Sequence, residues 1–211
     1  MAIITSGSTI TKLKVNGVPD KYNQNPSNAA LVTPYGTNGV QSTGVGKSSY
    51  IFYGSIAAAN GVTDIAAISG SSTKIIYITS VNIFSLQGTT GVNSYFLIKR
   101  STLNTSGAPT VATPVANDSN DAFSTATLTY YGGIASVGSS VSKVWSGWLN
   151  SEVNTNLGIV QDSNLFHSIN FLDLYGQPIC LRSASESLCL NLNGISVAAL
   201  TLYFQFLWTE E

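Results

Sequence analysis

The segment from Ser187 to Glu211 constrains the fold most, because apolar residues alternate with other residues along most of its length. Asn193-Gly194 interrupts this alternation. The Asn-Gly pair is the strongest short signal for a tight β-hairpin turn, whose two central residues both need positive φ. We therefore expect a closing β-hairpin that leads into a long last strand in the middle of a sheet.

The register of this predicted hairpin places Leu192 opposite Ile195 and Leu190 opposite Val197. Beyond these residues the apolar positions shift by one and continue at the even-numbered residues. A one-residue change of phase inside a strand is what a β-bulge produces, so we expect a bulge near Ala198-Ala199.

The chain has two cysteines, Cys180 and Cys189. If the residues from Ser183 to Glu186 form a hairpin loop, the two cysteines face each other across it, and a disulfide is conceivable. The alternative is a pair of small buried thiols in a protein that folds under reducing conditions, which is the commoner arrangement. The sequence leaves the redox state open.

Short strand-like segments separated by Gly, Asn and Ser clusters fill the middle of the chain. We expect strands at 50–56, 64–68, 74–86, 94–101, 126–131, 141–149, 165–172 and 178–182. This spacing predicts an all-β fold, an antiparallel β-sandwich that is most simply a jelly roll. The 74–86 segment has apolar residues at both odd and even positions, which predicts a strand that is covered on both faces or that passes into a subunit interface.

The first 47 residues differ from the rest, since Gly, Pro, Asn and Thr dominate and few apolar positions recur at regular intervals. A long segment of this kind is typical of an extended arm that gains its order from a partner. We therefore divide the chain into an extended N-terminal arm at residues 1–47 and a β-sandwich domain at residues 48–211.

Charged residues make up only 9% of the chain, hydrophobic residues make up 44%, and the formal net charge is −1. Because Lys and Arg are scattered, we expect no nucleic-acid partner. No apolar run is long enough for a transmembrane helix, and no secretory signal is present, so we expect no membrane partner and synthesis in a cytoplasm. Such a charge-poor chain is best explained by burial in an oligomer or an assembly.

Few residues offer catalytic or cofactor chemistry. Gly44 to Ser48 resembles the end of a phosphate-binding loop, but Gln41 stands where that motif needs Gly and a strand is expected to follow. The only histidine, His167, lies within a predicted strand, where a solvent-facing or hydrogen-bonded role is commoner than catalysis. We expect that the chain is not an enzyme, has no catalytic residues and has no cofactor.

Two further groups have a functional and a structural interpretation. Asn117 to Asp121 offers oxygen ligands for Ca²⁺, although Asx-rich loops more often hydrogen-bond to themselves. The aromatic residues Trp145, Trp148, Tyr130 and Tyr131 could form a sugar-binding platform, although packing in a core or interface is commoner. We expect no metal site.

Two blocks of sequence carry a family resemblance. The first runs from Ile98 to Tyr131 and contains IKRSTLNTSG and NDSN, and the second runs from Ile179 to Glu211 and contains NLNG and WTEE. Together they resemble a group of tailed-bacteriophage virion proteins over roughly 61–211. The segment at 141–164 has no matching landmark, and the first 47 residues are not covered.

The resemblance implies a structural virion protein with a β-sandwich knob, commonly a homotrimer. The leading hypothesis is a capsid decoration (cement) protein located in the virion, whose arm bridges major capsid proteins. The arm residues expected to contact the capsid are Ile3, Ile4, Ile10, Leu13 and Val15. The alternative is a tail-fibre or receptor-binding knob, in which the loops at 104–121 and 132–140 contact host glycan.

Overall fold

The computed structural model describes residues 48–57, 61, 63–87, 91–154, 159–164, 166–194 and 200–211. Most of these residues belong to antiparallel strands in two sheets, which confirms the predicted all-β sandwich. The predicted arm at 1–47 lies outside the described residues, so its capsid contacts at Ile3, Ile4, Ile10, Leu13 and Val15 remain predictions.

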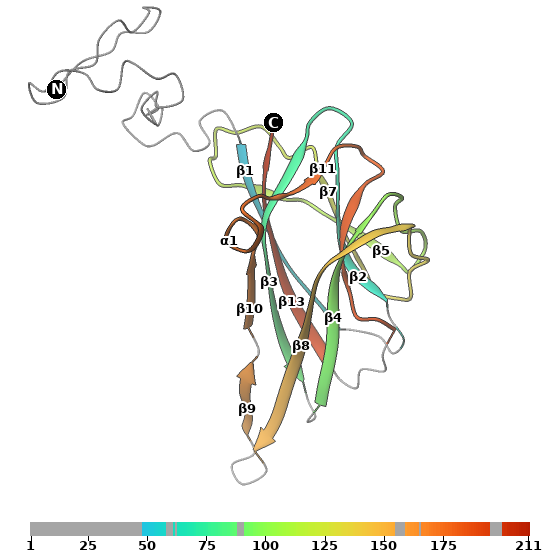
Figure 1. The fold of residues 1–211 in the computed structure, drawn as a ribbon, viewed down its shortest axis with the longest axis vertical. Coiled ribbons are helices and arrows are strands. Elements are labelled where there is room, and N and C mark those ends of the chain that lie inside the picture. The colour runs from blue at the N-terminus through green and yellow to red at the C-terminus, as the bar shows by residue number, and fades with distance from the viewer. Residues whose placement is uncertain are drawn as a thin grey trace, which may run out of the picture. The chain divides into compact units, whose positions relative to one another are not determined.

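Sheet 1 has six strands, ordered β10-β3-β13-β1-β6, with β11 also paired to β3 (Figure 1). Its strands are β1 (Ser48–Ala57), β3 (Ile76–Gln87), β6 (Val115–Ala116), β10 (Phe166–Asn170), β11 (Ile179–Leu181) and β13 (Leu200–Glu210). Sheet 2 has seven strands, ordered β5-β7-β2-β12-β4-β8-β9. Its strands are β2 (Asp64–Ser69), β4 (Gly91–Arg100), β5 (Pro109–Ala112), β7 (Thr127–Tyr131), β8 (Ser140–Asn154), β9 (Ile159–Asn164) and β12 (Ser187–Asn191).

The strand order is that of a jelly roll. Strands β1, β2, β3 and β4 alternate between sheet 1 and sheet 2, and so do β8, β10, β12 and β13. Within the sheets, β1 pairs with β13 and β2 pairs with β12, so the chain folds back on itself as a long double ribbon. Strand β13 lies between β1 and β3, as expected for a last strand inside a sheet.

The core lies between the two sheets. Alternate residues of β13, including Phe204, Phe206 and Trp208, are almost completely buried against residues of sheet 2 such as Leu97 and Leu190. The even-numbered phase predicted for the last strand is therefore correct.

Strand β3 has apolar residues on both faces, as the sequence indicates, but a bulge changes which of them face the core. The register against β13 shifts between Ile78 and Ser80, so Thr79 is left without a direct partner and its hydroxyl donates to the carbonyl of Leu207 at 3.1 Å. This bulge changes the phase of the strand. As a result Ile76, Ile78, Val81 and Ile83 all face the core, while Phe84 faces outward.

The closing hairpin is also corrected. Asn193 and Gly194 adopt the predicted positive φ, at 60° and 68°. However, β12 belongs to sheet 2 and β13 to sheet 1, and Leu190 lies opposite Ala66 and Leu97. Both edges of β12 are occupied by β2 and β4, so the turn carries the chain across to the other sheet. The predicted partners Ile195 and Val197, and the bulge predicted near Ala198-Ala199, lie outside the described residues.

The two cysteines do not face each other, because Cys180 lies on β11 in sheet 1 and Cys189 lies on β12 in sheet 2. The connection between them crosses from one sheet to the other and is held by its own hydrogen bonds, in which Arg182 N donates to Glu186 Oε2 at 2.6 Å and Glu186 N donates to Ser183 O at 3.1 Å. Both thiols are free. Burial raises the pKa of Cys189 to about 12, so this thiol is protonated and unreactive at neutral pH.

Two segments differ from the expected elements. The predicted 104–121 loop contains the short strands β5 and β6. The strand predicted at 165–172 ends at Asn170, whose side chain accepts hydrogen bonds from Leu172 N and Asp173 N and so caps helix α1 (Phe171–Tyr175). No helix among the described residues has both the length and the apolar character that crossing a membrane requires.

Candidate functional site

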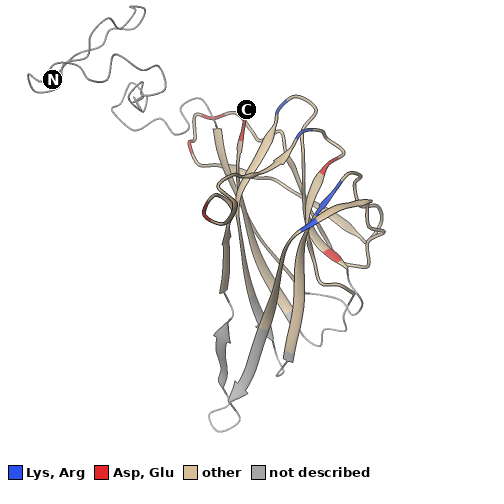
Figure 2. Ribbon diagram, viewed as in Figure 1, with Lys and Arg blue, Asp and Glu red and all other residues tan. Residues whose placement is uncertain are grey.

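The outer face of sheet 1 has no charge. In β1, β3, β10 and β13 the only Lys, Arg, Asp or Glu is Glu210, which points inward and is 1% exposed. Figure 2 shows this as uninterrupted tan ribbon along these strands, with red only at the end of β13. Charged side chains normally cover the solvent face of a sheet, so a charge-free face is informative.

Aromatic rings occupy the centre of this face. The strand registers place Tyr203, Phe84 and Phe166 in one row across β13, β3 and β10, and the rings of Phe84 and Tyr203 are 5.5 Å apart. Tyr53 of β1 stacks on Tyr203 at 6.2 Å. Tyr53 is 64% exposed and Phe166 is 63% exposed, so both ends of the row project into solvent. A shallow hollow of about 50 Å³ lies among these rings.

The outer face of sheet 2 is organised around a buried ion pair. Asp64 of β2 accepts hydrogen bonds from Arg100 Nε at 2.6 Å and from Arg100 Nη2 at 2.8 Å. Asp64 is 0% exposed and Arg100 is 4% exposed. Burial lowers the pKa of Arg100, but the hydrogen bonds and charge of Asp64 outweigh it, and the net shift is upward. The guanidinium of Arg100 therefore stays charged.

Amide side chains complete the hydrogen bonds of this pair and attach a loop to it. Asn104 Nδ2 donates to Asp64 at 2.8 Å, and Asn191 Nδ2 donates to its other oxygen at 2.5 Å. Arg100 Nη1 donates to the carbonyl of Gly138, while Gly138 N donates to Asn104 Oδ1. The segments at 101–107 and 133–139, which we call the loop cap, are thereby fixed over one end of sheet 2. A Cβ at Gly138 would lie 1.9 Å from the carbonyl oxygen of Thr102, so this close approach needs glycine.

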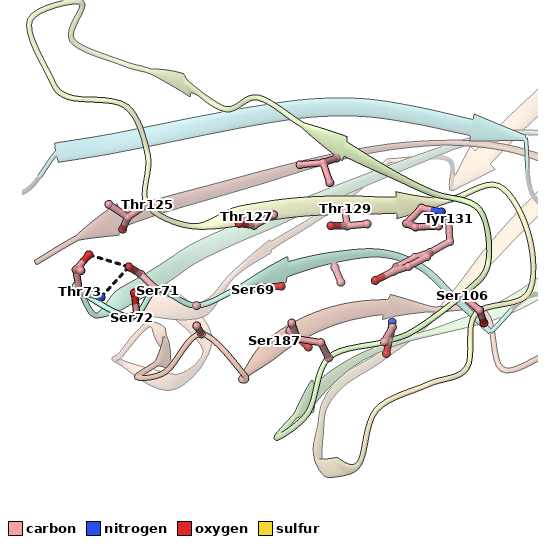
Figure 3. A pocket seen from close by; sticks show the side chains of 17 residues that line it. Ser69, Ser71, Ser72, Thr73, Ser106, Thr125, Thr127, Thr129, Tyr131 and Ser187 are labelled. Atoms are coloured by element: carbon pink, nitrogen blue, oxygen red, sulfur yellow. Dashed lines mark hydrogen bonds between the residues drawn. The ribbon is translucent and has the colours of Figure 1, made fainter.

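A groove of about 520 Å³ lies beside the loop cap on the outer face of sheet 2 (Figure 3). Its floor is formed by β2, β7 and β12, one wall by the loop cap and the other by β5. Its lining carries many hydroxyl groups and no charged side chain. The hydroxyl-bearing residues in the lining are Ser69, Ser71, Ser72, Thr73, Ser106, Thr125, Thr127, Thr129, Tyr131 and Ser187.

Glu210 is the buried carboxylate of sheet 1, and its oxygens are occupied by donors. Thr125 N, Thr125 Oγ1 and Ser124 Oγ donate to it at 3.0, 2.8 and 2.6 Å, Trp208 Nε1 donates at 3.2 Å, and Lys74 Nζ lies 3.7 Å away. Burial raises the pKa of Glu210, but these hydrogen bonds outweigh it and the net shift is downward. A carboxylate held in this way is a weak base and fixes the 124–126 segment to sheet 1.

His167 is a hydrogen-bonded residue of the core edge, as expected. Its Nδ1 lies 2.6 Å from Tyr95 Oη, and Trp145 Nε1 donates a hydrogen bond to the same Tyr95 Oη at 3.2 Å. Burial lowers the pKa of His167 and raises that of Tyr95 to about 12, so both rings are neutral at physiological pH. The His–Tyr–Trp group joins β10, β4 and β8 across the edge of the sandwich.

The other predicted sites are not assembled. Within the Asn117 to Asp121 loop, Asn120 N donates to Asp118 Oδ1 at 2.9 Å, which is the local Asx hydrogen bond expected of such a loop. The described residues contain no group of three His, Cys, Asp or Glu placed to hold a metal ion. Strand β1 begins at Ser48, so no helix follows the glycine-rich residues before it.

The four aromatic residues proposed as a sugar platform do not meet. Tyr130 and Tyr131 lie on β7, whereas Trp145 and Trp148 lie on β8, and β2, β12 and β4 separate these two strands. Tyr130 packs against Phe204 in the core and Tyr131 is buried beside the loop cap, while Trp148 is exposed.

No protein-family model matches the chain, and no curated protein has a matching sequence. The likeness to bacteriophage virion proteins therefore rests on the two quoted blocks of sequence alone.

The uncharged face of sheet 1 and the groove of sheet 2 were not predicted from the sequence as sites. The first leaves a readable pattern, since four of the predicted strands contain almost no charge. The second leaves a weaker one, since Thr127, Thr129 and Tyr131 alternate with the core residues Leu128 and Tyr130.

Proposed function

We propose that this chain is a structural protein of a bacteriophage virion, a capsid decoration (cement) protein whose β-sandwich associates with further copies of itself through the outer face of sheet 1. The observation that carries this proposal is the exposed aromatic face without charge. Exposed apolar patches of this kind mark interaction surfaces in soluble proteins. Aromatic residues are enriched and charged residues are depleted in the centres of such interfaces.

A second copy of the chain fits this face best. In a symmetric contact each residue meets the same surface on its neighbour, so like charges would repel, and this face has none. The net charge of the whole chain is only −1, which gives little repulsion between copies. The projecting rings of Tyr53 and Phe166 lie on the same face as the hollow between them. This face therefore carries both the projections and the hollow that two copies need in order to pack together. The homotrimer that the resemblance implies has heterologous contacts, in which this face would meet a different surface of the neighbouring copy, so it remains a separate prediction.

The resemblance supports the structural role from another direction. The Ile98 to Tyr131 block contains Arg100 and Asn104, which hold the loop cap in place. The block from Ile179 to Glu211 contains β12 and β13, which are interior strands of the two sheets. The residues that carry the resemblance thus build the scaffold of the sandwich.

Self-association is tested by light scattering on the purified full-length chain after size exclusion, and by sedimentation over a range of concentrations. We expect a mass that is a multiple of 22.2 kDa. Tyr203→Lys puts a charge at the centre of the aromatic face and is expected to weaken association by about 100-fold or more. Trp148→Lys is the control, because it places a lysine at an exposed aromatic residue of sheet 2, outside the aromatic face. A wild-type chain that is monomeric at every concentration would contradict the proposal.

The decoration role is tested separately on particles. Capsids that lack this protein should lose integrity at lower temperature and at higher salt concentration than complete capsids, and restoring the protein should reverse the loss. Leu13→Asp in the full chain should prevent binding to capsids without changing the oligomeric mass, because the arm and the sandwich are proposed to make different contacts. Hundreds of copies per virion support decoration, whereas a few to tens support a location in the tail. Equal resistance of capsids with and without the protein would refute the decoration role.

A further inference from the structure

The groove of sheet 2 is built so that hydroxyl groups stand side by side on its floor. The strand registers place Ser187, Ser69 and Thr127 in one row across β12, β2 and β7. The next row contains Cys189, Ala67 and Thr129. Because Ala67 has only a methyl group, the second row is low at its centre, and this gives the groove its depth. Figure 3 shows Ser69, Thr127 and Thr129 along adjacent strands.

Several of these hydroxyls are free to bind a ligand. Within the described part of the chain, the hydroxyls of Ser69, Ser72, Thr127 and Thr129 have no hydrogen-bond partner. Ser69 is only 8% exposed, yet its side chain lines the groove. Its hydroxyl oxygen is open to the groove, where water or a ligand can complete its hydrogen bonds.

The wall of the groove is rigid and neutral. Asn104 belongs to the wall, but both ends of its amide are held, by Asp64 and by Gly138. The nearby Asp64–Arg100 pair neutralises its own charge beneath the loop cap. Apolar carbon at the rim comes from Leu103, which is part of the loop cap, and from Pro109 and Val111 of β5. The lining therefore offers hydroxyls on the floor and apolar carbon at the rim.

We propose that this groove binds a neutral saccharide. A sugar ring presents hydroxyls at its edge and C–H groups on its faces, which match the floor and the rim, and the absence of charge in the lining disfavours acidic glycans and phosphates. The volume lies within the range of about 300–1,000 Å³ that is usual for small-molecule sites. This inference does not rest on self-association or on decoration. Such a groove would give a receptor-binding knob a binding site for saccharide.

The test uses the full-length protein and four neutral probes, the methyl glycosides of glucose, galactose, mannose and N-acetylglucosamine, with sialic acid as the acidic comparison. Saturation-transfer NMR at millimolar ligand detects binding, and titration gives the dissociation constant. We expect at least one neutral probe to bind and sialic acid to bind more weakly. The double substitution Ser69→Ala with Thr127→Val removes two hydroxyls with little change of shape and should weaken binding by about tenfold or more, at about three- to tenfold for each hydrogen bond.

Thr110→Val is the matched control, because Thr110 is an exposed residue of β5 that does not line the groove. It should leave affinity within about twofold of the wild type. Thr129→Val serves as a second groove variant if the double variant has a lowered unfolding midpoint. The oligomeric mass, measured on the same samples, should be unchanged by all groove variants, which separates this proposal from self-association. No binding of any neutral probe, equal binding of sialic acid, or unchanged affinity in both groove variants would each overturn it.

Discussion

The two sheets of this sandwich contribute to one core but differ in the surfaces that they present. Sheet 1 shows an uncharged outer face with a row of aromatic rings, whereas sheet 2 carries a buried ion pair, a loop cap and a hydroxyl-lined groove. The inward faces are alike because both sheets bury the same kind of apolar residue. The outer faces differ because nothing in the fold specifies them, so they are where assembly and recognition can be separated.

The difference also shows two uses of charge. In sheet 2, Asp64 and Arg100 are buried to hold a loop in a fixed position. In sheet 1, the single carboxylate is buried at the end of β13, and the outer face is left free of charge. Charge placement thus distinguishes the face proposed for self-association from the face proposed for ligand binding.

The largest expected effect comes from breaking the ion pair of sheet 2. Asp64→Ala leaves Arg100 buried without its partner and should lower the free energy of unfolding by about 3–5 kcal/mol. Urea titration at a fixed protein concentration measures this change. Asp118→Ala is the control, since Asp118 is exposed, and its effect should stay within about 0.5 kcal/mol. A loss of less than about 1 kcal/mol for Asp64→Ala would show that the loop cap does not depend on the ion pair.

The next largest effect concerns the carboxylate of sheet 1. Glu210→Gln replaces one acceptor oxygen by an NH₂ group facing the donors of Thr125 and Ser124, and should cost about 1.5–3 kcal/mol at neutral pH. Because the folded state lowers the pKa of Glu210, its stabilisation is complete above about pH 4.3, the unfolded value, and is lost as the pH falls through the folded pKa. The difference between wild type and variant should therefore shrink below that pH. A difference that stays constant with pH would contradict this assignment.

A smaller effect is expected where the two sheets meet. Trp145→Phe keeps the aromatic packing but removes the hydrogen bond to Tyr95, and should lower the free energy of unfolding by about 1 kcal/mol. Trp148→Phe, on the same strand but exposed, is the control and should change it by less than about 0.5 kcal/mol. Thermal unfolding of the two variants side by side distinguishes them. If the two variants lose equal stability, the Trp145 hydrogen bond contributes nothing.

The smallest expected effect is that of salt on self-association. Since the outer face of sheet 1 has no charge, the dissociation constant should change by less than about threefold when the screening length falls from about 10 Å at 0.1 M salt to about 3 Å at 1 M. Sedimentation at the two salt concentrations measures this. A change greater than about tenfold would place the contact on the charged surface of sheet 2 instead.

The sequence predicted strand positions well and strand partners poorly. Alternation along β13 identifies its buried face at Phe204 and Trp208, because that face depends only on the period of the strand. The partners depend on residues far away in the chain. The turn at Asn193 forms as expected, but β2 and β4 decide where β12 lies. A local turn fixes the direction of the chain, and the sheet to which the next strand belongs is fixed by long-range packing.

The same reason explains which parts of the candidate sites were missed. Asp64 and Arg100 are 36 residues apart, and no local pattern marks two such residues as partners. The uncharged face arises from four strands whose polar residues are each unremarkable. The uncharged surface becomes continuous only because these four strands are neighbours in sheet 1. Motifs with fixed local spacing, such as the capped turn at Asn170, leave a stronger trace in the sequence than surfaces assembled from several strands.

The position of β13 between β1 and β3 has a consequence for biosynthesis. Ser48 of β1 lies opposite Glu210 of β13 in the folded protein. Sheet 1 can therefore be completed only after β13, the last strand, has been synthesised. During translation β1 and β3 therefore emerge with unpaired backbone edges and apolar faces, a state that is slow to resolve and prone to aggregate. A chain that ends before Leu200 leaves those edges open. Such products should be recognised by chaperones or proteases, so the topology itself acts as a check that only chains translated through β13 reach the folded state.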